Sequence, residues 1–289
     1  MIMPKFIGIG APRCGTRWLA QCLAEHPEIA LPPYEVYFFT TRRMVLPLWS
    51  KGVDWYSGLF ENCSRPGLTT WGEITPVYLF DEETPSLMYQ CVPDAKLICC
   101  LRDQSERAHS WYRLFLKVHP DIFRTGYSFE AFLTYHTEVY GREGFYLEHL
   151  ERYFKFYPRE SMLILLYDDL KKDSLSYIKK IYEYLGVDGS YIPASVRRRI
   201  NPMVLELPRS KSLKRLAASL QKRRRLQKIG RFLVRLNMKE VPGSAFPRRH
   251  RLNPEIRDKI GKLHLEHNRK LADVLGRDLS HWNCGIKDN

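Results

Sequence analysis

The chain has 289 residues, long enough for one large domain, and its 44% hydrophobic and 13% aromatic content is typical of a globular protein rather than a disordered one. The net charge of +14 is local: residues 197–251 carry 18 Lys or Arg against two acids, whereas the rest carries 28 basic and 30 acidic residues. No apolar run is long enough to span a membrane, and no signal-peptide pattern opens the chain. We therefore expect a cytoplasmic protein with reduced cysteines, and without a Cys-x-x-Cys ligand pattern we expect no bound metal.

Apolar strands and helices alternate along the chain. Lys5–Gly10 predicts a buried strand, and Thr16–Glu25 predicts a helix that His26-Pro27 ends. The further strand and helix pairs are Ala95–Leu101 with Ser105–Leu116 and Met162–Tyr167 with Ser174–Leu185, and a last helix is Pro254–Leu275. Such alternation is typical of an α/β fold, so we expect a single domain over 1–289 with a central parallel sheet flanked by helices.

One segment, 208–243, interrupts this pattern and is strongly basic. Its apolar residues form two helical stripes that are out of phase across Lys222–Arg225, which predicts two short helices or one kinked helix inserted in the α/β body. Three explanations of the charge remain open: the segment steers an anionic donor and acceptor, contacts an anionic membrane through residues 208–242, or is a solvated helical face. No nucleic-acid-binding motif accompanies it, so we expect no nucleic acid partner.

The first strand leads into a loop and a helix over Gly10–Trp18 (GAPRCGTRW), which we call the anion loop. Backbone N–H groups at the helix start favour an anion, and the two glycines let the backbone approach it closely. Thr16 adds a hydroxyl, and the guanidinium of Arg13 can hold an oxyanion with two hydrogen bonds. The spacing resembles a Walker A loop, but Thr16-Arg17 stands where that motif needs Lys-[Ser/Thr], so the hydroxyl that would hold magnesium is missing. The loop therefore predicts a metal-free phosphate site.

A second basic site follows the strand at 95–101. Arg102 leaves the carboxyl end of that strand, where ligands bind in open α/β sheets, and Ser110 lies in the next helix. A cation and a hydroxyl so placed can hold a second phosphate. The alternative is that Arg102 only forms a surface salt bridge with Asp103 or Glu106.

Together these motifs resemble the sulfotransferases that use PAPS (3'-phosphoadenosine-5'-phosphosulfate). The donor loop of that family is a basic residue followed by x-Gly-Thr-Thr, or by x-Gly-Thr-Arg in part of the heparan-sulfate branch, and here it reads Arg13-Cys14-Gly15-Thr16-Arg17. The family's second site, Arg-Asp-Pro-x-x-Arg-x-x-Ser-x-Tyr, is matched from Arg102 to Tyr112 with Gln104 in place of Pro. Arg17 makes the chain more similar to the heparan-sulfate and carbohydrate branch than to the cytosolic small-molecule branch, although Arg13 replaces the usual Lys.

The resemblance implies a P-loop-like donor site that binds PAPS as the sulfuryl donor and PAP as its product, without a metal. It implies that Arg102 and Ser110 hold the 3'-phosphate, and Phe246–His250 is similar to the late donor-binding loop of the family. The implied donor-binding residues are Arg13, Cys14, Gly15, Thr16, Arg17, Trp18, Arg102, Ser110, Arg248 and Arg249.

Sulfuryl transfer needs a base for the acceptor hydroxyl and a cation for the leaving phosphate. Tyr34–Phe39 resembles the Glu-x-x-Phe-Phe segment of the heparan-sulfate branch, which implies Glu35 as the catalytic base, with Arg13 as the leaving-group cation. Glu73 lies in a segment similar to the branch's Glu-Lys-Ser/Thr-Pro-x-Tyr and is the reserve candidate. Ile74 replaces the Lys that assists at the reacting centre in that branch.

The acceptor is expected to be a glycan, a glycolipid or another lipid-linked or small-molecule alcohol. Aromatic residues after the first helix form either a stacking wall for an acceptor ring or ordinary core; they are Tyr34, Tyr37, Trp49, Trp55 and Tyr56. His109 rivals Glu35 as a base, but it lies in the helix of Ser110, and we expect it to be either packed or on the surface. Two other functions remain open: a P-loop kinase-like protein, which would need magnesium, and a non-enzymatic basic adaptor for membrane or nucleic acid. The sequence leaves the oligomeric state open.

Overall fold

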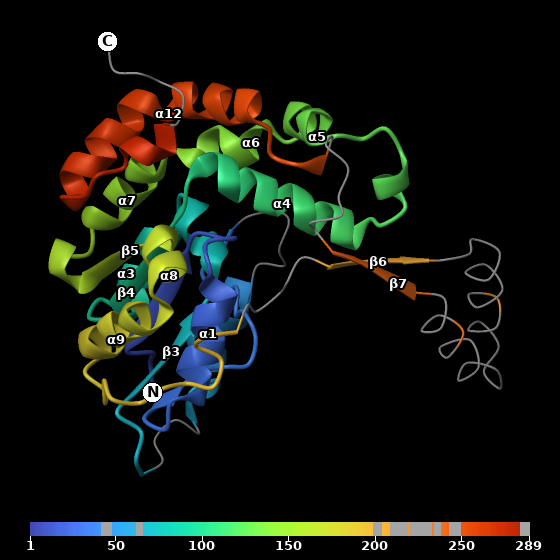
Figure 1. The fold of residues 1–289 in the computed structure, drawn as a ribbon. Coiled ribbons are helices and arrows are strands. Elements are labelled where there is room, and N and C mark those ends of the chain that lie inside the picture. The colour runs from blue at the N-terminus through green and yellow to red at the C-terminus, as the bar shows by residue number, and fades with distance from the viewer. Residues whose placement is uncertain are drawn as a thin grey trace.

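The computed structural model describes residues 1–41, 48–61, 66–198, 204–208, 219, 233, 238–242 and 250–283. A parallel sheet of five strands lies at the centre, in the order β2-β3-β1-β4-β5 (Figure 1). The strands are β1 (Phe6–Gly10), β2 (Ile29–Ala30), β3 (Thr70–Ile74), β4 (Lys96–Leu101) and β5 (Met162–Leu166). The predicted α/β class with a central parallel sheet is confirmed.

Helices surround this sheet, and α4 and α12 lie side by side across one end of it (Figure 1). The α-helices are α1 (Thr16–Glu25), α2 (Gly52–Gly58), α3 (Thr84–Cys91), α4 (Gln104–Val118), α5 (Phe129–Tyr135), α6 (Thr137–Tyr140), α7 (Tyr146–Phe154), α8 (Tyr167–Lys172), α9 (Ser174–Leu185) and α12 (Pro254–Leu275). The short 3₁₀ helices are η1 (Leu48–Lys51), η3 (Pro76–Phe80), η4 (Ile122–Arg124), η5 (Arg142–Gly144), η6 (Arg159–Ser161) and η10 (Ser280–Asn283). The predicted bounds of α9 and α12 agree with the structure because Gly186 and Gly276 take the left-handed conformation that ends each helix.

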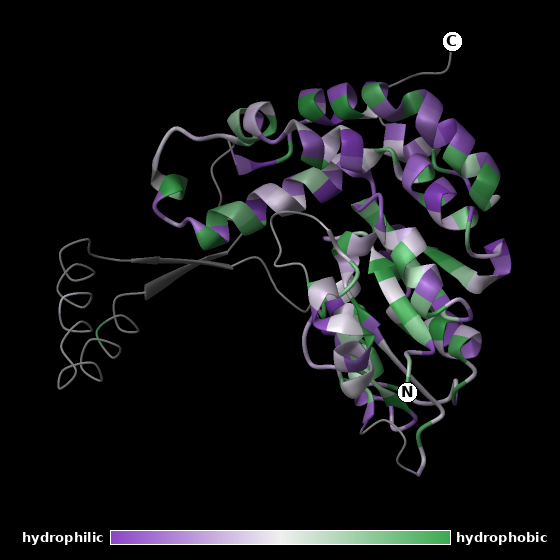
Figure 2. Cartoon of the chain, turned by 180° about the vertical axis from the view of Figure 1, so that it is seen from behind, coloured by the Kyte–Doolittle hydropathy of each residue, from purple (hydrophilic) through white to green (hydrophobic). Residues whose placement is uncertain are grey.

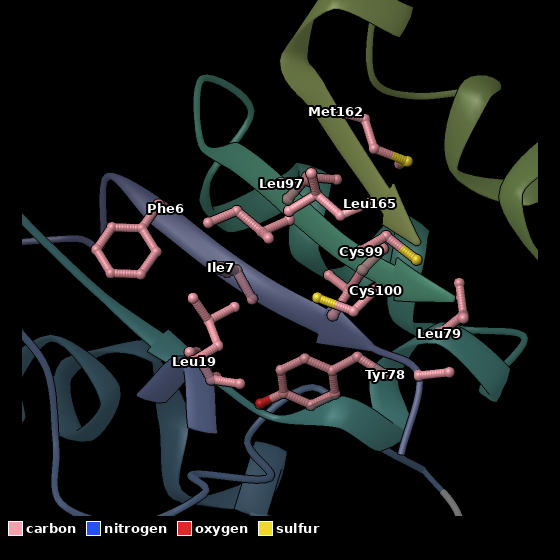
Figure 3. Packing of buried hydrophobic residues seen from close by; sticks show 14 of the residues in the cluster. Phe6, Ile7, Leu19, Tyr78, Leu79, Leu97, Cys99, Cys100, Met162 and Leu165 are labelled. Atoms are coloured by element: carbon pink, nitrogen blue, oxygen red, sulfur yellow. The ribbon is translucent and has the colours of Figure 1, made fainter. Parts of the chain in front are cut away.

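The core lies between the sheet and these helices. Every residue of β1 is buried, as expected for a strand covered on both faces. Cys99 and Cys100 project to opposite sides of β4 (Figure 3), as the alternation of a strand requires. The strands are mostly hydrophobic, whereas α4 and α12 alternate hydrophilic and hydrophobic turns (Figure 2). The sheet is therefore a rigid frame whose carboxyl end carries the loops described next.

An antiparallel pair of strands, which the sequence did not predict, encloses the basic segment: β6 (Val204–Pro208) leads into it and β7 (Met238–Pro242) lies at its end. The helices predicted between them, and the basic surface that these would carry, lie outside the described residues apart from positions 219 and 233. Among the helices that the structure describes, none is long and apolar enough to cross a membrane.

Candidate active site

The anion loop joins β1 to α1 and is anchored on β4 by the Ala11 N–H, which donates to the Cys100 carbonyl (2.8 Å). Gly15 caps α1 in the left-handed conformation (φ 89°) and offers no side-chain oxygen to the helix. The N–H groups of the first turn of α1 therefore have no side-chain cap, and they lie at the positive end of the helix dipole. A helix start of this kind is suited to an anion such as phosphate.

Arg13 and Arg102 bring the anion loop and α4 together. Arg13 Nε donates to Ser110 Oγ (3.1 Å), and Arg102 Nη1 donates to the Arg13 carbonyl (3.2 Å). The salt bridge that the sequence left as an alternative is also present, since Arg102 Nη2 lies 3.0 Å from Glu106 Oε2. The Arg102 guanidinium also stacks on the Tyr167 ring, 4.3 Å from its centroid, a contact that sequence reasoning missed. The two basic sites inferred from separate parts of the sequence are thus one continuous surface.

Positive charge accumulates on this surface. Burial, followed by repulsion from Arg102, lowers the pKa of Arg13, and Arg17 at the exposed start of α1 adds to that repulsion. Glu106 offsets part of the charge, but it is shared between Arg102 and Lys171, which lies 3.3 Å away. A bound phosphate would relieve the repulsion between the guanidinium groups, so the electrostatics favour an anion here.

The side chains of Cys14 and Trp18 point away from this surface. Cys14 is fully buried, and burial raises the pKa of its thiol to about 12, so it remains protonated. Trp18 packs edge-on against Tyr177 of α9, with ring centroids 5.9 Å apart. Thr16 is also buried. Cys14 and Trp18 can therefore contact an anion only through their backbone N–H groups.

Gln104, which stands where the resembling motif has Pro, connects α4 to the end of the chain. Its Nε2 donates to Asn268 Oδ1 of α12 (2.7 Å), and Asn268 Nδ2 donates to Asn283 Oδ1 (2.9 Å). All three residues are buried, so the amides satisfy one another's hydrogen bonds in the core. This departure from the motif therefore ties the start of α4 to the C-terminal helix.

Glu35 is exposed and opens residues 35–39, which we call the base segment; Val36, Phe38 and Phe39 of this segment are buried. Its carboxylate accepts a hydrogen bond from the Tyr37 hydroxyl, a partner that the sequence did not single out. The backbone N–H of Val36 donates to Thr75 Oγ1 (3.0 Å), at the carboxyl end of β3. Because Thr75 N in turn donates to the Gly8 carbonyl of β1 (2.9 Å), the base segment is fixed at the same end of the sheet as the anion loop.

Glu73 is fully buried beneath this segment. Its carboxyl group accepts hydrogen bonds from the hydroxyls of Tyr56 (2.6 Å), Thr75 (2.6 Å) and Tyr78 (3.2 Å). Burial raises the pKa of Glu73 to about 7, although these hydrogen bonds act in the opposite direction. Because no surface of Glu73 is exposed, its geometry suits a structural role, and its reserve role as base stays a prediction.

The remaining sequence candidates divide between core and surface. Ile74 is buried in the core, so its side chain does not face the site in the way the Lys of the resembling motif would. Tyr56 stacks on Phe38 with ring centroids 4.3 Å apart, which makes Tyr56 part of the core, whereas Tyr34 is exposed and available to an acceptor.

His109, the rival candidate for the base, is held inside the protein. Its Nε2 pairs with the His250 carbonyl (3.0 Å), and burial lowers the pKa of His109 to about 4. His109 is therefore a packed, neutral residue, the first of the two positions that the sequence left open.

Two expectations remain, one on the donor-binding residues Arg248 and Arg249 and one on bound metal. Arg248 and Arg249, implied as donor-binding residues, lie outside the described residues. Among the described residues, no group of His, Cys, Asp and Glu side chains is arranged to hold a metal ion.

Replacing Gly15 by Ala should weaken the binding of PAP and lower the melting temperature. The positive φ of Gly15 disfavours any side chain, and a Cβ would lie 2.8 Å from Leu170 Cδ2. The end of the Leu170 side chain can turn aside, but the strained backbone would shift the loop, and its N–H groups with it. Gly186→Ala is the matched control, because Gly186 has a similar φ (75°) but open space around its Cβ position. It should cost about 1 kcal/mol of stability and leave PAP binding unchanged in calorimetry; equal losses of affinity in both variants would contradict the role of the loop.

The family description "Sulfotransferase domain" matches residues 3–271. Over 205 residues, 65% of this chain, it is 30% identical to the mouse (Mus musculus) bifunctional heparan sulfate N-deacetylase/N-sulfotransferase 4, covering 23% of that protein. Over 194 residues, 64% of this chain, it is 30% identical to the mouse heparan sulfate glucosamine 3-O-sulfotransferase 3B1, covering 46% of it. The chain thus spans less than half the length of either relative.

The fold has a counterpart among solved structures. A sulfotransferase from Alicyclobacillus acidocaldarius superposes with a TM-score of 0.66 over 98% of this chain and 99% of its own, at 22% identity. Likeness at that identity shows a shared fold, whereas the family match extends over the anion loop, the base segment and α4. The chain therefore belongs to the sulfotransferase family.

Proposed function

We propose that this chain transfers a sulfuryl group from PAPS to a hydroxyl group of a carbohydrate acceptor. The observation that carries the proposal is the contact between the anion loop and α4, where Arg13, Arg102 and Ser110 meet. One end of that surface is a helix start suited to the 5' side of the donor, and the other is a cation and hydroxyl suited to the 3'-phosphate. A nucleotide with two separated anionic ends fits both.

In this proposal, separate residues act as the base, stabilise the leaving group and hold the donor. Glu35 accepts the proton of the acceptor hydroxyl as its oxygen attacks sulfur, and the bond between sulfur and the bridging phosphate oxygen breaks. Arg13 and the N–H groups at the start of α1 stabilise the charge that gathers on the leaving 5'-phosphate. Arg102 and Ser110 hold the 3'-phosphate of the donor and so fix its position along the anion loop.

The names of two relatives support the proposed acceptor class. Both similar mouse proteins are named for heparan sulfate, which supports a carbohydrate acceptor for this chain. Tyr34, next to Glu35, is exposed, and an exposed aromatic ring suits stacking on a sugar, which supports the proposal. The supporting test is transfer of labelled sulfate from PAPS to a panel of glycans, glycolipids, sterols and phenols. Labelling confined to sterols or phenols would contradict the carbohydrate assignment.

PAP should bind in EDTA as tightly as in magnesium. The anion loop lacks the Lys-[Ser/Thr] pair that a magnesium-dependent P-loop uses, and its own cations neutralise the phosphates. Calorimetry of PAP with and without EDTA measures this. Binding that requires magnesium would favour a kinase-like protein instead, and an absence of binding would favour an adaptor without donor chemistry.

A further inference from the structure

The hydroxyl groups that hold the base segment all donate to one buried carboxyl group, that of Glu73. Glu73 lies at the carboxyl end of β3 with no exposed surface, and three hydroxyls donate to it, from Tyr56 of α2, Tyr78 of η3 and Thr75. Among the described residues, no cation contacts it, so neutral donors compensate its burial: the three hydroxyls and the backbone N–H of Val36. An arrangement of this kind costs stability, because a buried carboxylate is better compensated by a cation than by neutral donors.

Two of these hydroxyls also contact the base segment. Thr75 Oγ1 accepts the backbone N–H of Val36 (3.0 Å) and faces that of Tyr37 (3.4 Å), and the Tyr78 hydroxyl accepts the N–H of Phe39 (3.3 Å). Each hydroxyl has a single proton. When that proton is directed at Glu73, the oxygen lone pairs face the base segment and can accept from its backbone.

The backbone held in this way is of unusual conformation. Tyr37 has a φ of 58°, in the left-handed region that a residue with a side chain adopts only when its surroundings require it. This conformation brings the Tyr37 hydroxyl to the carboxylate of Glu35. The position of the Glu35 carboxylate therefore depends on the hydrogen bonds from the base segment to the hydroxyls of Thr75 and Tyr78.

We propose that Glu73 is a positioning residue, which acts through the hydroxyls of Thr75 and Tyr78 to hold the base segment, and with it the carboxylate of Glu35, at the reacting centre. The inference rests on the proposed role of Glu35 as the base. It also gives a reason for a carboxyl group buried without a cation. An ionised carboxylate accepts hydrogen bonds on both of its oxygens, so the protons of the Thr75 and Tyr78 hydroxyls point at Glu73 and away from the base segment.

Protonation of Glu73 should weaken the hydrogen bonds that hold the base segment. A neutral carboxyl group has a hydrogen-bond donor of its own, so one of the three hydroxyls must turn to accept it. When Thr75 or Tyr78 turns, its lone pairs no longer face the base segment. The titratable groups that face Glu73 are Tyr56 and Tyr78, and burial raises the pKa of both well above 10, so they stay protonated. Because the pKa of Glu73 is raised to about 7, activity should fall as the pH is lowered through that value.

Thr75→Val tests the inference, since it removes the hydroxyl and keeps the shape of the side chain. Measured well above pH 7, kcat should fall about 10- to 100-fold, because a small misplacement of a catalytic group has an effect of that size. The affinity for PAP should stay within about twofold, as the donor site is not touched. Thr75→Ser, which restores the hydroxyl, should recover most of the activity.

A matched control separates positioning from stability. Tyr56→Phe also removes a hydrogen bond to Glu73, but the Tyr56 hydroxyl has no contact with the base segment among the described residues. It should lower the melting temperature about as much as Thr75→Val and leave kcat nearly unchanged at the same pH. Glu73→Gln, which cannot ionise, should lower kcat and remove the fall in activity near pH 7.

The results of these experiments test the positioning role of Glu73 separately from the proposed role of Glu35 as the base. If Glu35→Gln is inactive while Thr75→Val keeps its full kcat, Glu35 remains the base and the positioning role of Glu73 is wrong. If Glu35→Gln keeps its activity, the base itself is wrong and the inference falls with it. If Thr75→Val does not fold, Tyr78→Phe supplies the same test through Phe39; equal kcat in Tyr78→Phe and Tyr56→Phe would overturn the inference.

Discussion

Glu35→Gln should abolish sulfuryl transfer while leaving the binding of PAP intact. The substitution removes the group that accepts the proton of the acceptor hydroxyl, and general bases of this kind contribute about 10²- to 10⁴-fold to the rate. The amide keeps the size of the carboxyl group and can still pair with the Tyr37 hydroxyl, so the base segment should keep its conformation. Because Glu35 contacts neither Arg13 nor Arg102 in the described hydrogen bonds, the donor surface is unaffected.

The measurement combines single-turnover transfer of labelled sulfate with calorimetry of PAP. The loss should appear in the rate of transfer and not in the dissociation constant of PAP. Glu83→Gln is the matched control, because Glu83 is another exposed glutamate, at the start of α3, and should keep full activity. Activity of Glu35→Gln within about tenfold of the wild-type rate would exclude the carboxylate as the base.

Arg102→Ala should weaken the binding of PAP far more than that of an analogue lacking the 3'-phosphate. A charge-assisted hydrogen bond to a partly buried phosphate contributes about 1.5–3 kcal/mol, which corresponds to roughly 10- to 150-fold in affinity. Arg102 also donates to the Arg13 carbonyl, so some loss is expected for both ligands. The difference between the two losses is the quantity that reports the 3'-phosphate contact.

Calorimetry of both ligands with the wild-type protein and the variant forms a double-mutant cycle between Arg102 and the 3'-phosphate. Arg269→Ala removes an exposed arginine that pairs with Glu266 on α12, and it should change neither affinity. Equal losses for PAP and for the analogue in Arg102→Ala would mean that Arg102 only supports the anion loop. The 3'-phosphate would then have to be held elsewhere.

The sequence predicted the elements whose ends carry a clear signal. His26-Pro27 and Gly186 mark helix ends, and the apolar runs of β1, β4 and β5 are continuous, so their positions could be predicted to within about one residue. β3 was missed because it contains Gly72 and Glu73, which are poor strand residues by composition. Gly72 is required there, since a Cβ would lie 2.1 Å from the Phe6 carbonyl oxygen of the neighbouring strand.

The site was predictable in its parts but not in its connections. The anion loop and Arg102 were found from local motifs, yet the hydrogen bond from Arg13 to Ser110 joins residues 97 apart, and no local pattern encodes it. The same is true of Glu73, whose surroundings come from α2, η3 and the base segment. Burial and hydrogen-bond partners distinguish a buried anchor from a base, and these exist only once the chain is folded.

The chain of amides from Gln104 to Asn283 has a consequence for the order of events during synthesis. Asn268 follows Gln104 by 164 residues, which a ribosome takes about 10–30 s to add. Throughout that interval the side chain of Gln104 lacks the Asn268 amide, so the start of α4 cannot yet form its contacts with the C-terminal helix. The family match ends at residue 271, but an expression boundary placed there would leave the Asn268 amide without Asn283. A protein trimmed to the matched region should therefore be less stable than one that keeps η10.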